Sequence, residues 1–130
     1  MSTIVAGYRD TPESQAALEW AIAHAQRERA RLVVVATPSG GGAVGVSPEQ
    51  EIDLLRDRLV TAAVEHTIVH LNGERPAADE ILERAAGVDA DLIVVGQRRR
   101  SPVGKMLLGS TSQRILLDAT CPVVAVKAPS

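Results

Sequence analysis

The residues of this chain best suited to hold an anion lie between Asp91 and Ser112. An apolar, β-rich run ends at Gly96, an arginine-rich segment follows, and Gly109-Ser110-Thr111-Ser112 comes next. The first backbone amides of a helix have no partner within the helix, and the helix dipole makes that end partly positive. A helix that begins on Gly-Ser-Thr-Ser therefore offers exposed amides and hydroxyls together, which favours a bound phosphate.

The charge of this stretch also favours an anionic ligand. Between Leu92 and Leu117 there is no acidic residue, whereas the same span contains several cations, namely Arg98, Arg99, Arg100, Lys105 and Arg114. Charge runs are usually solvated loops, but this one lies between a predicted strand end and a predicted helix start. The formal net charge of the chain is −2, which argues against a general nucleic-acid binder. A local anion site is the better interpretation.

Length and composition indicate one globular domain over residues 1–130. Hydrophobic residues make up 45% of the chain, and because Phe is absent the core must consist mainly of Val, Ile, Leu and Ala. The single Cys121 excludes an internal disulfide, as expected in a reducing cytosol. No signal peptide is visible and no apolar run approaches transmembrane length, so we expect a soluble, cytoplasmic protein with no membrane partner.

The apolar pattern predicts five strands alternating with four helices. The strands are expected at 3–7, 31–36, 67–71, 91–96 and 123–127, and the helices at 12–29, 48–65, 76–86 and 110–119. Each connection is long enough for a right-handed crossover between parallel strands. We therefore predict an α/β fold: a single open five-stranded parallel sheet with helices on both faces, Rossmann-like. The strand order 3-2-1-4-5 would bring the ends of the first and fourth strands to one crevice, where such sheets bind ligands.

Other motifs in the chain carry less weight. Gly104-Lys105 resembles the end of a P-loop, but Met106 stands where Ser or Thr is required. Residues 40–45 spell G-x-G-x-x-G, but they touch neither a strand end nor a helix start, so a flexible loop is predicted. The three histidines lack ligand spacing, and no metal site is expected. No Ser/His/Asp order or paired carboxylates indicate catalytic residues.

Several motifs agree with one protein family in both order and spacing. Val94-Val95-Gly96 ends the fourth predicted strand, Cys121-Pro122-Val123 begins the fifth, and residues 11–18 read T-P-E-S-Q-A-A-L. With these motifs the chain resembles the universal stress protein family, whose mark is G-x-x-G-x9-G-[S/T]. Gly96 and Gly109-Ser110 keep that mark, but Arg99 replaces its second glycine. Arg9 stands where ATP-binding members place an acid near the ribose, and Asp10 is one step later.

The resemblance implies a regulatory protein of the stress response that binds ATP or AMP, with Mg²⁺ accompanying ATP and at most slow ATP hydrolysis. Adenine would lie at the ends of the first two strands, near Gly7, Tyr8, Val35, Ala36 and Thr37. Asp10 would face the ribose if the loop turns it inward. The phosphates would meet Gly109, Ser110, Thr111 and Ser112, over a floor of Val95 and Gly96. Their charge would be neutralised by Arg98, Arg99 or Lys105.

An alternative is a nucleotide-free dimeric interaction module, in which Arg9 and Arg99 mark a site that has drifted. In either case the apolar last strand, Val123 to Val126, is predicted at an edge of the sheet. An uncovered apolar edge invites pairing with another strand. The resemblance likewise implies a homodimer through this strand.

Overall fold

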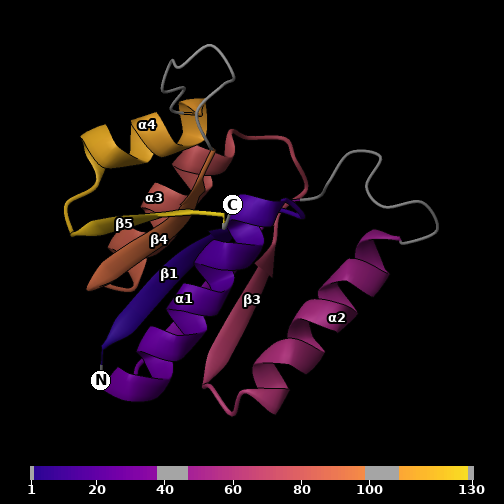
Figure 1. The fold of residues 1–130 in the computed structure, drawn as a ribbon. Coiled ribbons are helices and arrows are strands. Elements are labelled where there is room, and N and C mark those ends of the chain that lie inside the picture. Colours follow the sequence, from indigo (N-terminus) through magenta and orange to yellow (C-terminus); the bar gives the residue numbers. More distant parts are fainter. Residues whose placement is uncertain (1, 38–46, 99–108, 129–130) are drawn as a thin grey trace.

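Five parallel strands form one sheet in the computed structural model, which describes residues 2–37, 47–98 and 109–128 (Figure 1). The strands are β1 (Thr3–Tyr8), β2 (Arg31–Ala36), β3 (His66–His70), β4 (Leu92–Gln97) and β5 (Val123–Lys127). Their order is β3-β2-β1-β4-β5, and every neighbouring pair is parallel. The predicted sheet and its strand order are confirmed. The glycine-rich segment 40–45 and the cations Arg99, Arg100 and Lys105 lie outside the described residues.

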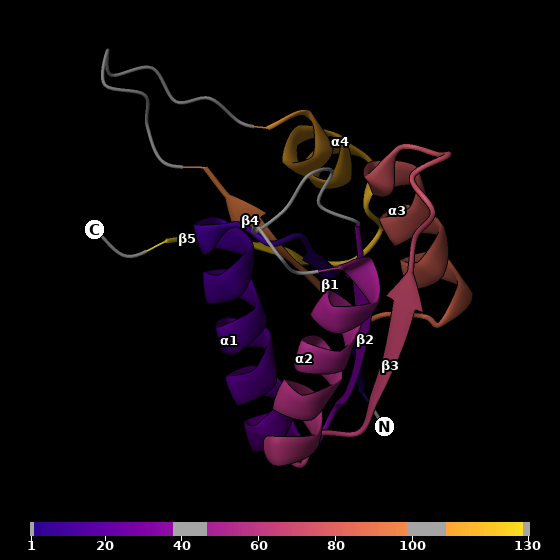
Figure 2. The same cartoon turned by 90° about the vertical axis from the view of Figure 1, so that its right-hand side faces the viewer.

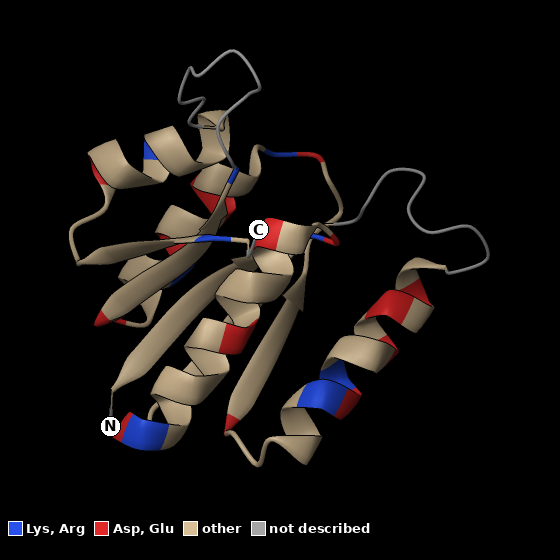
Figure 3. Ribbon diagram, in the orientation of Figure 1, with Lys and Arg blue, Asp and Glu red and all other residues tan. Residues whose placement is uncertain are grey.

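Four helices cover the two faces of the sheet, as predicted (Figures 1 and 2). They are α1 (Pro12–Glu28), α2 (Pro48–Thr61), α3 (Ala77–Gly87) and α4 (Ser110–Asp118). Alternate residues of β1 enter different cores: Ile4 packs with residues of α1 and α2, whereas Val5 packs with residues of α3 and α4. Charged residues lie on the helices and at the ends of the strands (Figure 3). The apolar strands are therefore enclosed on both sides, as parallel strands usually are.

The first two helices begin where their sequence predicts. Thr11 and Ser47 are the N-caps of α1 and α2, and their side-chain oxygens accept hydrogen bonds from the amides of Ser14 and Gln50. Proline follows each cap, at a position where its missing N–H costs nothing. The helices α3 and α4 begin without a side-chain cap. Their first amides are therefore open to other acceptors.

One helix is shorter than expected. The prediction extends α2 to residue 65, but the helix ends at Thr61. Ala63 has a φ of 57°, in the left-handed region, which an L-residue adopts in single positions and cannot continue as a helix. This turn lets Val64 enter the core at 7% exposure, and β3 begins at His66.

Candidate functional site

A cleft of about 240 Å³ lies at the carboxyl ends of β1 and β4. This is the crevice where the strand order reverses, and loops from the two neighbouring strands diverge there. The walls come from the ends of β1, β2 and β4 and from the first turns of α1, α3 and α4. Most of the predicted site residues that the structure describes line it, namely Gly7, Tyr8, Thr37, Val95, Gly96, Arg98, Gly109, Ser110, Thr111 and Ser112.

The other predicted site residues lie elsewhere or are not described. Val35 and Ala36 are buried within β2, with 0% and 4% of their surface exposed. The Asp10 carboxylate accepts a 3.4 Å hydrogen bond from the Gln15 side chain, and Asp10 lines a neighbouring hollow between α1 and α2. Arg99 and Lys105 fall outside the described residues.

Some residues of the cleft were not predicted. The first turn of α1 contributes Thr11, Glu13 and Ser14, and α3 contributes Ala77 and Ile81. The signal for the α1 residues was present, because they follow β1 closely in sequence and begin a helix at the same edge of the sheet. Ala77 and Ile81 carry no such signal, since their nearness to β1 depends on how α3 packs.

Gly96 allows α1 to approach the sheet. A Cβ atom at this position would lie 2.6 Å from the carbonyl carbon of Glu13 and 2.8 Å from the amide nitrogen of Ser14. Both are backbone atoms, so no side chain could move to make room. The glycine therefore sets the distance between the end of β4 and the first turn of α1. That distance fixes one wall of the cleft.

The first turn of α4 presents polar groups without an acidic neighbour. Gly109 occupies the N-cap position, no side chain caps the helix, and no acid lies in its first turn. Ser110 and Thr111 line the cleft, whereas the hydroxyl of Ser112, itself 6% exposed, donates to the Gly96 carbonyl oxygen at 3.1 Å. Uncapped amides and the helix dipole together favour an anion at this point.

Two arginines of the described part of the chain line the cleft. Arg9 follows β1 and Arg98 follows β4, and both side chains are exposed. Among the described residues, neither forms an ion pair. The carboxylate of Glu13 also belongs to the lining. Among the described residues, the charged lining of the cleft therefore consists of Arg9, Arg98, Glu13 and the positive end of α4.

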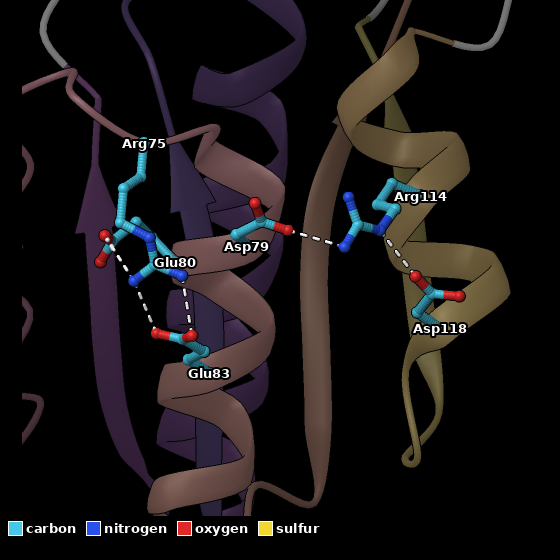
Figure 4. A network of polar contacts seen from close by, with 6 residues as sticks. All are labelled: Arg75, Asp79, Glu80, Glu83, Arg114 and Asp118. Carbon is cyan, nitrogen blue, oxygen red and sulfur yellow. Dashed lines mark hydrogen bonds and ion pairs between the residues drawn. The ribbon is translucent and has the colours of Figure 1, made fainter.

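Arg114, counted among the cations of the segment, is engaged elsewhere. Its guanidinium pairs with Asp79 of α3 at 2.7 Å and with Asp118 of its own helix at 2.6 Å (Figure 4). These carboxylates raise the pKa of Arg114, Asp118 contributing most. A second arginine in the same view, Arg75, pairs with Glu80 and Glu83. Arg114 therefore joins α3 to α4 and is not among the residues that line the cleft.

The end of β1 is held by a chain of polar contacts. The Tyr8 hydroxyl accepts a 2.6 Å hydrogen bond from the side-chain amide nitrogen of Gln15, and the side-chain oxygen Oε1 of Gln15 accepts another of 2.6 Å from the guanidinium of Arg58 in α2. Burial raises the pKa of Tyr8, and the nearby Asp10 charge raises it further. The ring of Tyr8 is therefore fixed between the cleft and the two helices on that face.

Among the described residues, no three His, Cys, Asp or Glu side chains are grouped so that they could hold a metal ion. Within the described ranges, no helix is both long enough and apolar enough to cross a membrane.

The comparison with protein families agrees with this architecture. Residues 1–127 match the model of the universal stress protein family. The chain belongs to that family. A universal stress protein of Mycolicibacterium smegmatis is 37% identical over 126 residues, covering 95% of this chain and 96% of that protein. A universal stress protein of Thermus aquaticus is 33% identical, with 96% and 98% of the two chains covered.

Solved structures of the family share the fold. A universal stress protein from Archaeoglobus fulgidus has a TM-score of 0.73 and 28% identity, with 98% of each chain covered. Another from the same organism, solved in complex with dAMP, has a TM-score of 0.63 and 22% identity, again with 98% of each chain covered. One from Arabidopsis thaliana with AMP bound has a TM-score of 0.68 and 16% identity, covering all of this chain and 93% of that one.

Proposed function

We propose that this universal stress protein binds an adenine nucleotide, AMP or ATP, in the cleft at the ends of β1 and β4, as a cytoplasmic regulatory protein of the stress response. One observation carries the proposal: the first turn of α4, which has no side-chain cap, and Arg98, which forms no ion pair with another described residue, line the same cleft as the ends of β1 and β2. Solved members of the family with dAMP and AMP support it by analogy.

We assign a part of the nucleotide to each wall on the basis of the residues that line it. The phosphates would accept hydrogen bonds from the amides at the start of α4 and from the hydroxyls of Ser110 and Thr111. Arg98 would neutralise their charge, and Arg99 and Lys105 remain candidates from the following segment. Adenine would lie over Gly7, Tyr8 and Thr37, where the Thr37 amide joins the Tyr8 carbonyl oxygen at 2.8 Å. Mg²⁺ would accompany ATP chiefly through the phosphate oxygens.

Released nucleotide provides the first test. The purified protein is denatured and the supernatant is examined for AMP and ATP, and the nucleotide-free protein is then titrated with AMP, ATP and adenosine at low salt. We expect the wild-type protein to bind AMP. We expect Arg98→Ala to lower the affinity for AMP more than the affinity for adenosine. Arg27→Ala, which removes the same charge from the distant last turn of α1, serves as the matched control. Absence of both released nucleotide and titratable binding would refute the proposal.

The alternative is a nucleotide-free interaction module, and the edge strand β5 favours it. Its residues are only partly buried, and Ala125 in its middle is exposed. The Glu13 carboxylate in the cleft, which repels a phosphate, points the same way. We propose a homodimer through Val123 to Val126 in either case, because an apolar edge strand is a template for pairing. The nucleotide titration separates the two functions.

A further inference from the structure

We infer that the preferred ligand of the cleft carries a second phosphate, on its ribose: an adenosine bisphosphate esterified at the 5′ position and at the 2′ or 3′ hydroxyl. The inference rests on the proposed adenine-nucleotide function and adds the class of nucleotide. Arg9 is the residue that carries it.

The strand order determines which part of a nucleotide meets Arg9. The cleft extends from Thr37 at the end of β2, past Arg9 at the end of β1, to Arg98 and Ser110. Because β1 pairs with β2 on one side and with β4 on the other, Arg9 lies between the two ends of the cleft. A nucleotide with its base at the β2 end and its 5′-phosphate at α4 must pass its ribose across the end of β1. Arg9 therefore faces the sugar.

The hydrogen-bonding chemistry of the guanidinium group favours a ribose that carries a phosphate. Arginine only donates hydrogen bonds, so it cannot accept the proton of a free ribose hydroxyl. Its planar fork matches two oxygens of a phosphate, and such charge-assisted bonds are among the strongest in proteins. Dinucleotide-binding folds show the same choice, with an acid on a free ribose hydroxyl and an arginine on a ribose phosphate.

The surroundings leave Arg9 available for that role. Its side chain is exposed, and it forms no ion pair with another described residue, although Glu13 lines the same cleft. The 5′-phosphate has its own partners at the start of α4 and at Arg98, so a separate anion is left for Arg9. Glu13 contributes a carboxylate to the same lining, and a carboxylate can accept a hydrogen bond from a free ribose hydroxyl while it repels a phosphate.

Calorimetric titrations at one fixed ionic strength test the inference, because exposed charges are screened by salt. AMP, adenosine 2′,5′-bisphosphate and adenosine 3′,5′-bisphosphate are titrated into the nucleotide-free protein. At least one bisphosphate is expected to bind roughly tenfold or more tighter than AMP, the ratio that one added charge-assisted contact gives. The bisphosphate that binds more tightly shows whether the 2′ or the 3′ hydroxyl carries the second phosphate.

Variants of Arg9 separate a specific contact from general charge. Arg9→Ala is expected to bring the bisphosphate-to-AMP affinity ratio to about one, and Arg9→Asp, which adds an acceptor, to reverse the preference toward AMP. Arg27→Ala changes the net charge equally and should keep the wild-type ratio. Thermal unfolding of each variant checks that it is folded, which is expected because both arginines are exposed.

The outcomes distinguish this inference from the proposed function. If AMP binds and neither bisphosphate binds more tightly than AMP, the inference of a ribose phosphate is wrong, while the proposal of adenine-nucleotide binding stands. If a bisphosphate binds tighter but Arg9→Ala keeps the ratio, Arg9 is not the specificity residue. If none of the three nucleotides binds, both proposals fail.

Discussion

The hydroxyl of Ser112 donates a 3.1 Å hydrogen bond to the carbonyl oxygen of Gly96. This bond joins the first turn of α4 to the end of β4, the two elements that precede and follow residues 98–109 in the sequence. Gly96 at the same time touches the first turn of α1. One residue of β4 therefore determines where two helix N-termini lie around the cleft.

Removing the Ser112 hydroxyl should weaken this link. Ser112→Ala loses one hydrogen bond at a site that is 6% exposed, and we expect the free energy of unfolding to fall by about 1 kcal/mol. The affinity for AMP should fall as well, because the amides of α4 are less firmly held. Urea denaturation measures the first effect. Ser110→Ala, in the same turn but exposed, is the control and should leave stability unchanged; equal losses in the two variants would contradict the assignment.

Gly96 and Gly109, the two glycines of the family mark that this chain keeps, should respond differently to an added methyl group. Gly96→Ala places a Cβ against backbone atoms of Glu13 and Ser14, so α1 must shift at a cost of roughly 1–3 kcal/mol. A Cβ at Gly109 meets no described residue within 4 Å, and its φ of −59° suits any residue. Gly109→Ala should therefore cost only what the poorer N-cap residue loses, about 0.5 kcal/mol and less than Gly96→Ala. Thermal or urea unfolding measures the stability of both variants. A Gly96→Ala protein as stable as the wild type would show that the close approach of α1 to Gly96 does not limit the residue at this position.

Tyr8 should titrate above its ordinary pKa of 10.0. It is the single tyrosine of the chain, so the rise in ultraviolet absorbance that accompanies tyrosinate formation reports this group alone. Burial is the main cause and the Asp10 charge the second, so Asp10→Asn should lower the pKa of Tyr8, whereas Asp89→Asn should not. Because the folded state holds the proton more tightly, this contribution to stability is complete below the unfolded pKa and declines as the pH rises through the folded pKa. An unchanged titration in Asp10→Asn would exclude the electrostatic contribution.

The edge strand β5 supplies a test of self-association. Light scattering of the wild-type protein should give the mass of a dimer. Ala125→Lys places a charge on the exposed middle of the strand, a substitution that blocks edge pairing, and should give a monomer. Thr120→Lys adds the same charge at an exposed position outside the strand and should remain dimeric. A wild-type monomer, or a dimeric Ala125→Lys protein, would argue against pairing through β5.

Much of the fold could be predicted because its signals are local. Thr11-Pro12 and Ser47-Pro48 start their helices where the cap chemistry requires, and the apolar runs of β2 and β4 become strands enclosed on both faces. The end of α2 was missed because nothing in the sequence at Ala63 demands a left-handed residue. The left-handed conformation of Ala63 is instead favoured by the packing of Val64 in the core, which depends on tertiary structure.

The candidate site was likewise predictable in part from the sequence and in part only from the tertiary structure. By itself the sequence determined the α/β class, the polar helix start at Gly109-Ser110 and the family, since residue types and spacing carry these. Only the tertiary structure decided that Arg9 and Arg98 share one cleft, that Arg114 is paired with Asp79, and that Asp10 lies in another hollow. The physical reason is that periodicity and capping act between residues a few positions apart. Proximity between Arg9 and α4 depends on how distant segments pack, and on which partners a long charged side chain finds there.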